Sequence, residues 1–99
     1  MKILIVNPNT SRTMTEKIEV VANRVARADS SVTVRGLQRG PVTIESSYDE
    51  AYAVGPTVQL VRAALEEQYD AIILACFCEV GVEAAREIST IPVFGLGAF

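Results

Sequence analysis

The sequence predicts an α/β fold, in which a four-stranded parallel sheet with the strand order 2-1-3-4 forms the middle of a three-layer αβα arrangement. Two observations lead to this prediction. Short apolar runs of strand length alternate with longer segments of helical periodicity, and the intervals between the runs are too long for hairpins. Parallel strands need crossover connections, and because these are right-handed, helices cover both faces of the sheet. We expect residues 1–99 to form one domain.

Four segments have the character of strands. Residues 2–6 and 71–75 are apolar throughout or nearly so, which is typical of strands covered by helices on both faces. Residues 32–37 alternate between apolar and polar side chains and suit the edge of the sheet. Residues 91–95 are expected to form the last strand, with Pro92 near its start, where a missing N–H is tolerated.

Helices are expected between these strands. The first should follow a turn at residues 7–11, and Thr13 and Glu16 have the spacing of a capping box. Its apolar stripe, which should cover one face of the sheet, consists of Met14, Ile18, Val21, Ala22 and Val25. Residues 48–67 have the same periodicity, but Gly55-Pro56 either kinks this helix or divides it into two, because proline removes an amide donor. A third helix is expected over residues 82–88.

The composition excludes several classes of function. The net charge is −3 and the basic residues are dispersed, so no nucleic-acid partner is expected. No apolar run is long enough to span a bilayer and no signal sequence follows Met1, which predicts a cytoplasmic protein without a membrane partner. The chain contains no His, which excludes Ser–His and Cys–His couples within it. Cys76 and Cys78 alone are a weak metal signal, so neither a metal nor a cofactor is expected.

The chemistry is expected at the carboxyl edge of the sheet, where ligands bind in open α/β folds. Cys76, Cys78 and Glu79 follow the third strand directly and precede the third helix, whose N-terminus would favour a thiolate or an anionic ligand. In the order 2-1-3-4 the loop at residues 7–11 lies beside them. The loop at residues 45–47 reaches toward the same edge.

Each candidate also has a purely structural interpretation. Cys76, at the end of an apolar strand, can be simply a small buried residue, and the side chain of Cys78 should point away from it in an extended segment. Glu79 suits the start of a helix. Four polar residues can serve only as turn or cap groups, because caps and anion sites use the same amides: Asn9, Thr10, Ser11 and Ser46.

Several short motifs occur along the chain in a fixed order. They are Asn7-Pro8-Asn9-Thr10-Ser11 with Met14-Thr15, Gly40-Pro41 before Ile44-Glu45-Ser46, Asp49-Glu50-Ala51, and Tyr69-Asp70-Ala71 leading to Ala75-Cys76-Phe77. This set resembles the Asp/Glu racemase superfamily, and within it the hydantoin/allantoin racemase family. The resemblance covers essentially the whole chain but only the first half of such a protein. It implies one of two similar lobes that face each other across an active site, each lobe contributing one cysteine.

The resemblance implies a cofactor-independent racemase that moves a proton at a carbon next to a carbonyl. Cys76 matches the catalytic cysteine of the first lobe, whose thiolate would remove the proton while a cysteine of the other lobe protonates the opposite face. The substrate would be a small molecule, namely hydantoin, allantoin or a related carbonyl compound. Its contacts are expected at the matching residues Asn9, Thr10, Ser11 and Ser46. Further contacts are expected at the residues that directly follow Cys76, namely Phe77, Cys78 and Glu79.

The chain departs from the family pattern in two places. Cys78-Glu79-Val80 stands where the family commonly has Gly and then Asp-Pro, and Gly97-Ala98-Phe99 lacks an acid that often occurs there. Two other functions therefore stay open: isomerisation or decarboxylation of a small dicarboxylate, and a non-catalytic remnant that binds small anions. Because a lone lobe exposes the face meant for the second lobe, a homo-oligomer is expected.

Overall fold

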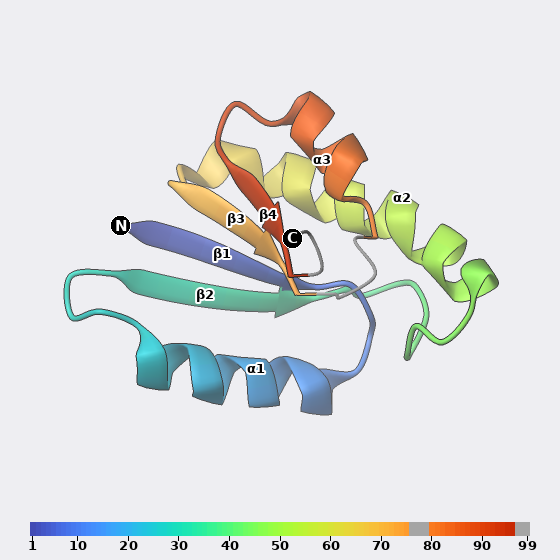
Figure 1. The fold of residues 1–99 in the computed structure, drawn as a ribbon, viewed down its shortest axis with the longest axis horizontal. Coiled ribbons are helices and arrows are strands. Elements are labelled where there is room, and N and C mark those ends of the chain that lie inside the picture. Colours follow the sequence, from blue (N-terminus) through green and yellow to red (C-terminus); the bar gives the residue numbers. More distant parts are fainter. Residues whose placement is uncertain (76–79, 97–99) are drawn as a thin grey trace.

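The protein forms a doubly wound parallel sheet, as described by a computed structural model for residues 1–75 and 80–96 (Figure 1). In chain order the elements are β1 (Lys2–Asn7), α1 (Arg12–Val25), β2 (Ser31–Gly36), α2 (Ser47–Ala64), the 3-10 helix η1 (Leu65–Glu67), β3 (Ala71–Leu74), α3 (Val82–Ile88) and β4 (Val93–Gly95). The strands pair in parallel in the order β2-β1-β3-β4, which confirms the predicted topology. Helix α1 lies on one face of the sheet, and α2 and α3 lie on the other.

The main core lies between the sheet and the α2/α3 layer. Side chains at alternate strand positions point into it, so that Leu4, Ile72 and Leu74 are completely buried. The full cluster consists of Leu4, Val6, Val61, Ala64, Tyr69, Ile72, Leu74, Val82, Ala85 and Val93. Since burying one large aliphatic side chain contributes about 1.5–3 kcal/mol, this face supplies most of the hydrophobic stabilisation.

The opposite face of the sheet is only partly covered. Ile5 and Ile73 point to the side of α1 and line an apolar groove with that helix. The next residue across the sheet on this face, Phe94 of β4, is 52% exposed. The predicted apolar stripe of α1 packs on the sheet less closely than expected. Among the residues of this helix only Ala22 is buried, and Val25 is 73% exposed. Helix α1 connects β1 to β2 and lies over those strands, so β3 and β4 have no helix on this face within the described part of the chain (Figure 1).

The N-cap of helix α1 lies two residues before Thr13, where the predicted capping box begins. Ser11 is the N-cap, and its hydroxyl accepts a hydrogen bond from the Met14 backbone N–H at 3.1 Å. The predicted box between Thr13 and Glu16 is wrong, because Thr13 already lies inside the helix that starts at Arg12.

Helix α2 continues through Pro56, so the alternative of two separate helices is wrong. The amide that Pro56 lacks would have bonded the carbonyl of Tyr52, a residue on an exposed turn of the helix whose own exposed fraction is 50%. The helix ends at Ala64, and residues 65–67 form η1. The amino-terminal turns of α2 extend past the carboxyl edge of the sheet (Figure 1).

Strand β4 begins at Val93, later than the predicted residue 91. The Ser89 hydroxyl accepts from the Ile91 N–H at 3.1 Å and donates to the Ile91 carbonyl at 2.7 Å. These bonds hold Ile91 in the turn before the strand. Pairing with β3 nevertheless starts at Pro92, whose carbonyl accepts from the Ile72 N–H at 2.9 Å.

An ion pair joins the edge strand β2 to η1. The Arg35 guanidinium donates two hydrogen bonds to the Glu67 carboxylate, at 2.8 and 2.6 Å. These bonds hold the pKa of Glu67 below its ordinary value of 4.5, and they raise the pKa of Arg35. Because the pKa of Glu67 is lowered by folding, the pair stabilises the protein above that ordinary value, and the effect disappears as the pH falls through the lowered pKa.

Glu67→Gln should therefore lower the melting temperature at neutral pH, and the difference from the unsubstituted protein should shrink steadily below about pH 4.5. Thermal unfolding followed by circular dichroism from pH 7 to pH 2.5 measures it. Glu66→Gln is the matched control, since it makes the same charge change at the neighbouring residue without breaking the Arg35 pair. A difference for Glu67→Gln that is constant across this range would contradict the prediction.

Candidate functional site at the carboxyl edge of the sheet

The two central strands, β1 and β3, lie side by side, and the helices that follow them in the chain lie on opposite faces of the sheet. After β1 the chain passes to α1, and after β3 it passes to α3 on the other face (Figure 1). The pairing continues beyond β3, because the Ala75 N–H donates to the Val6 carbonyl at 2.8 Å. A point where the helices after two neighbouring strands lie on opposite faces is where open α/β sheets bind ligands. Four predicted site residues, Cys76, Phe77, Cys78 and Glu79, lie outside the described residues.

The loop after β1 contains a closed set of hydrogen bonds, which we call the polar ring (Asn7, Asn9, Ser11 and Thr15). Asn9 Oδ1 accepts from the Ser11 backbone N–H and from Asn7 Nδ2, both at 2.9 Å. Asn7 Nδ2 also donates to the Thr15 hydroxyl at 3.0 Å. That hydroxyl donates to the Ser11 carbonyl at 3.2 Å, which closes the ring. The polar ring fixes the conformation of the loop between β1 and α1.

Asn7 is the residue that sequence reasoning missed. It was predicted only as a turn former, but it is the last residue of β1 and is 1% exposed. Its side chain lies on the α1 face of the sheet, in the same alternation as Ile3 and Ile5, and reaches Thr15 in the first turns of α1. A buried amide needs partners, and the polar ring supplies them for the Nδ2 group of Asn7. The alternation along residues 3–7 was the available signal.

The same loop is tied to the chain that follows β2. The Leu37 N–H donates to the Asn9 carbonyl, and the Thr10 N–H donates to the Pro41 carbonyl, both at 2.9 Å. Gly36 allows this approach: a Cβ atom there would overlap the Thr15 hydroxyl oxygen and lie 3.4 Å from the Asn9 carbonyl oxygen. Sequence reasoning included Gly36 in a strand but could not detect this contact, which depends on how α1 packs.

Three predicted contact residues, Asn9, Thr10 and Ser11, lie together in this loop. Ser46 does not join them through any hydrogen bond between described residues. Its hydroxyl caps α2 by accepting from the Asp49 N–H at 3.1 Å, at the helix end that extends past the sheet (Figure 1). The structural role of Ser46 is therefore observed, and its contact with a substrate stays a prediction.

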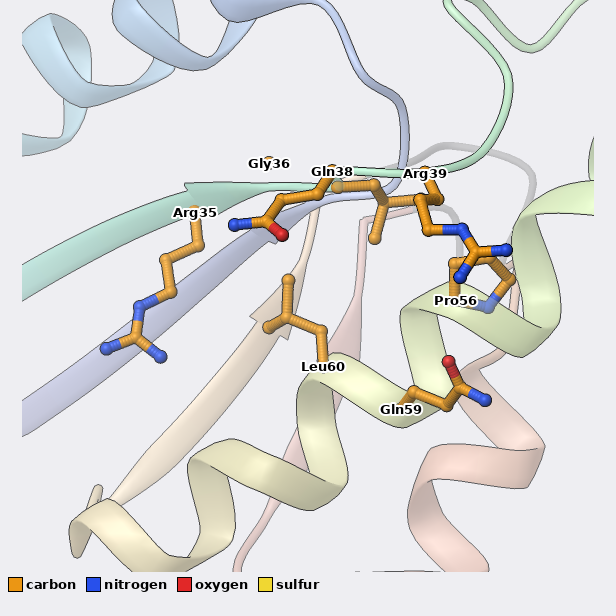
Figure 2. Close-up of a pocket in the computed structure, with 8 residues that line it drawn as sticks. Arg35, Gly36, Gln38, Arg39, Pro56, Gln59 and Leu60 are labelled. Atoms are coloured by element: carbon orange, nitrogen blue, oxygen red, sulfur yellow. The ribbon is translucent and has the colours of Figure 1, made fainter.

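Two grooves flank the end of β2. One of about 580 Å³ lies between this strand and α2, where Figure 2 shows Arg35, Gln38 and Arg39 on the side of the strand and Pro56, Gln59 and Leu60 on the side of the helix. The 580 Å³ groove belongs to the outer edge of the sheet and not to the β1–β3 junction. The second groove, of about 400 Å³, adjoins the polar ring and is lined by Thr10, Arg12, Thr15, Gly36, Leu37 and Gln38.

Behind the junction, α2 packs against the start of α3. Gly81 has a φ of +75°, which favours glycine, and a Cβ there would lie 3.5 Å from the Cγ2 atom of Thr57. The Thr57 hydroxyl is buried and has no hydrogen-bond partner among the described residues. Such an unpaired group is uncommon in a protein interior.

Within residues 1–75 and 80–96, no three His, Cys, Asp or Glu side chains are grouped so that they could hold a metal ion. In the same part of the chain no helix combines the length and the apolar character needed to cross a membrane.

A model of the Asp/Glu/hydantoin racemase family matches residues 3–98. The chain belongs to this family. Among solved structures it resembles an allantoin racemase from Klebsiella pneumoniae, with a TM-score of 0.92 and 36% identity over 96% of this chain and 39% of that one. An allantoin racemase from Pseudomonas fluorescens matches with a TM-score of 0.88 and 29% identity, covering 96% of this chain and 40% of that one.

Curated relatives give the same result. Hydantoin racemases from Pseudomonas sp. (strain NS671) and Paenarthrobacter aurescens are 38% and 37% identical to the chain, and each match covers 97% of it. The chain spans 39% and 41% of the length of these relatives. The family resemblance carried by the motifs and the αβα fold predicted from the apolar runs are thus confirmed.

Gly36→Ala should destabilise the protein by about 1–3 kcal/mol, because Thr15 can move away from the new methyl group only by breaking its bonds in the polar ring. Urea unfolding measures this change. Gly55→Ala is the matched control: a Cβ at Gly55 meets nothing within 4 Å, and alanine in a helix should stabilise it by about 0.5–1 kcal/mol. Equal stability of Gly36→Ala and the unsubstituted protein would show that the contact is not tight.

Proposed function

We propose that the chain is the first lobe of a cofactor-independent racemase that acts on hydantoins or allantoin. The names of its relatives support this substrate class. The observation that carries the proposal is the bond between Ala75 and Val6. Ala75 directly precedes Cys76 in the sequence, and Val6 directly precedes Asn7, the first residue of the polar ring. The matching cysteine therefore follows the junction where open α/β sheets bind ligands.

In the proposed reaction the Cys76 thiolate removes the proton from the carbon next to a carbonyl group. The electron pair of that C–H bond moves toward the carbonyl oxygen, where negative charge develops. Donors of the β1–α1 loop, on Asn9, Thr10 and Ser11, would stabilise this charge. A second thiol, from the remainder of a longer protein, would return a proton to the opposite face. Further substrate contacts are proposed for Ser46, Phe77, Cys78 and Glu79.

A cytoplasmic location is part of the same proposal. The reaction needs Cys76 as a free thiol, and cytosolic thiols are kept reduced, whereas an oxidising compartment would favour disulfides.

With Cys76 as its only base, the chain alone should exchange the acidic proton faster than it racemises the substrate. In D₂O, an enantiomerically pure 5-substituted hydantoin should gain deuterium at C5 with the original configuration largely kept. Cys76→Ser should reduce this exchange at least about 100-fold, to near the protein-free rate, because it removes the base. Mass spectrometry and chiral chromatography give the two rates. Rapid racemisation that Cys76→Ser leaves unaffected would rule out the assignment of Cys76.

We further infer that the chain forms a homo-oligomer through the partly covered face of the sheet. We call this face the open face. It consists of the groove beside α1 and of four exposed apolar residues: Val21 (57% exposed), Val25 (73%), Phe94 (52%) and Leu96 (38%). An apolar groove of about 460 Å³ runs between α1 and β3 on the same side. Contiguous apolar surface of this kind favours association.

Phe94→Glu should therefore shift the chain toward monomer, since burying a carboxylate in an apolar interface is costly. Sedimentation velocity at high micromolar concentration measures the distribution. Val42→Glu is the matched control, because Val42 is 68% exposed and lies in the loop between β2 and α2, outside the open face. A strictly monomeric unsubstituted chain, or a Phe94→Glu variant that associates equally well, would contradict the inference.

A further inference from the structure

The hydrogen-bond directions in the polar ring are fixed by two backbone groups. The Ser11 N–H can only donate, so the Asn9 atom 2.9 Å from it is the carbonyl Oδ1 and not the amide nitrogen. Asn7 faces the same oxygen, and it must therefore present its Nδ2 there. At the other end, the Ser11 carbonyl can only accept, which directs the Thr15 proton toward it and leaves the Thr15 oxygen to accept from Asn7. The orientation of both amides follows from the backbone.

This arrangement leaves Asn9 with donors only. Its Oδ1 already accepts two hydrogen bonds. Its Nδ2 has no acceptor among residues 1–75 and 80–96, and the side chain is only partly buried, beside the carboxyl end of β1. A ligand group that meets Asn9 must therefore be an acceptor.

The groups that impose this orientation act through Asn9. Asn7 is 1% exposed and holds the Asn9 oxygen from the interior side. Thr15 holds Asn7, and Gly36 leaves Thr15 the space to do so, since a methyl group at residue 36 would overlap its hydroxyl.

We propose that Asn7, Thr15 and Gly36 are positioning residues that turn the Asn9 amide so that its N–H groups recognise a carbonyl oxygen of the substrate. The identity of that substrate rests on the proposed function. A ring N–H of a hydantoin would meet a donor at this position and leave both groups unpaired, whereas a ring carbonyl satisfies the donor. The polar ring thus selects which edge of the substrate faces the β1–α1 loop.

Asn9→Asp separates this role from a structural one. A carboxylate at residue 9 still accepts from the Ser11 N–H and from Asn7 Nδ2, so the fold and melting temperature should be retained. It has no N–H to donate, so affinity for hydantoin, measured by ¹⁵N NMR titration of the 99-residue chain, should fall at least about tenfold. Unchanged affinity in Asn9→Asp would overturn the proposal.

Thr15→Val and Thr15→Ser form a matched pair for the positioning step. Valine has the shape of threonine but cannot accept from Asn7, and it should lower hydantoin affinity severalfold, whereas serine keeps the hydroxyl and should restore it. Equal affinity in Thr15→Val and Thr15→Ser would count against a positioning role for the hydroxyl.

A second readout keeps this test independent of the proposed function. The Asn7 side-chain N–H protons should exchange slowly with solvent in the unsubstituted chain and in Thr15→Ser, and markedly faster in Thr15→Val. If the chain binds neither hydantoin nor allantoin, the proposed substrate class is wrong. The exchange rates still test whether the Thr15 hydroxyl holds the Asn7 amide in place. Identical exchange in all three proteins would overturn the positioning device itself.

Discussion

The pairing of β1 with both β2 and β3 is the constraint on which the rest of the structure depends. Since crossovers are right-handed, a chain that first moves from β1 to β2 and then back past β1 to β3 must place α1 on one face and α2 on the other. The helices that follow β1 and β3 consequently lie on opposite faces of the sheet. The junction that the Ala75–Val6 bond closes is a product of strand order, and no individual side chain creates it.

The polar ring links the stability of this junction to its chemistry. Asn7 ends a strand whose other side chains on the α1 face, Ile3 and Ile5, are aliphatic. A buried amide without partners would cost about 1–3 kcal/mol there. The amide donors of Asn7 are satisfied by Asn9 and Thr15, and the same two bonds decide which end of the Asn9 amide remains available. A change that frees the amide would therefore affect both the packing of α1 and the ligand edge that the loop accepts.

Sequence reasoning found the strands, their order and the family because these depend on local apolar runs and on a general rule of handedness. It found the cap at Ser46, which is also local. It missed Asn7 and the contact of Gly36 with Thr15, because each joins residues whose approach depends on the position of α1 against the sheet. Periodicity likewise identified the apolar stripe of α1 but could not show how little of it another element covers, and Val25 stays exposed. Cys76 and the three residues after it stay predictions.

The open face cannot be covered by simply extending the sheet beyond β4. A further parallel strand next to β4 would bring its right-handed crossover helix to the α2/α3 side, where the core is already packed. A cover for β3 and β4 on the α1 side therefore needs a segment other than such a crossover helix, and a second copy of the chain would supply one. The groove of the open face includes Ala75 and Met14, which lie at the same carboxyl edge as the junction. A partner on the open face would thus also contact Ala75, the residue directly before Cys76 in the sequence. Association through this face would therefore affect the proposed chemistry.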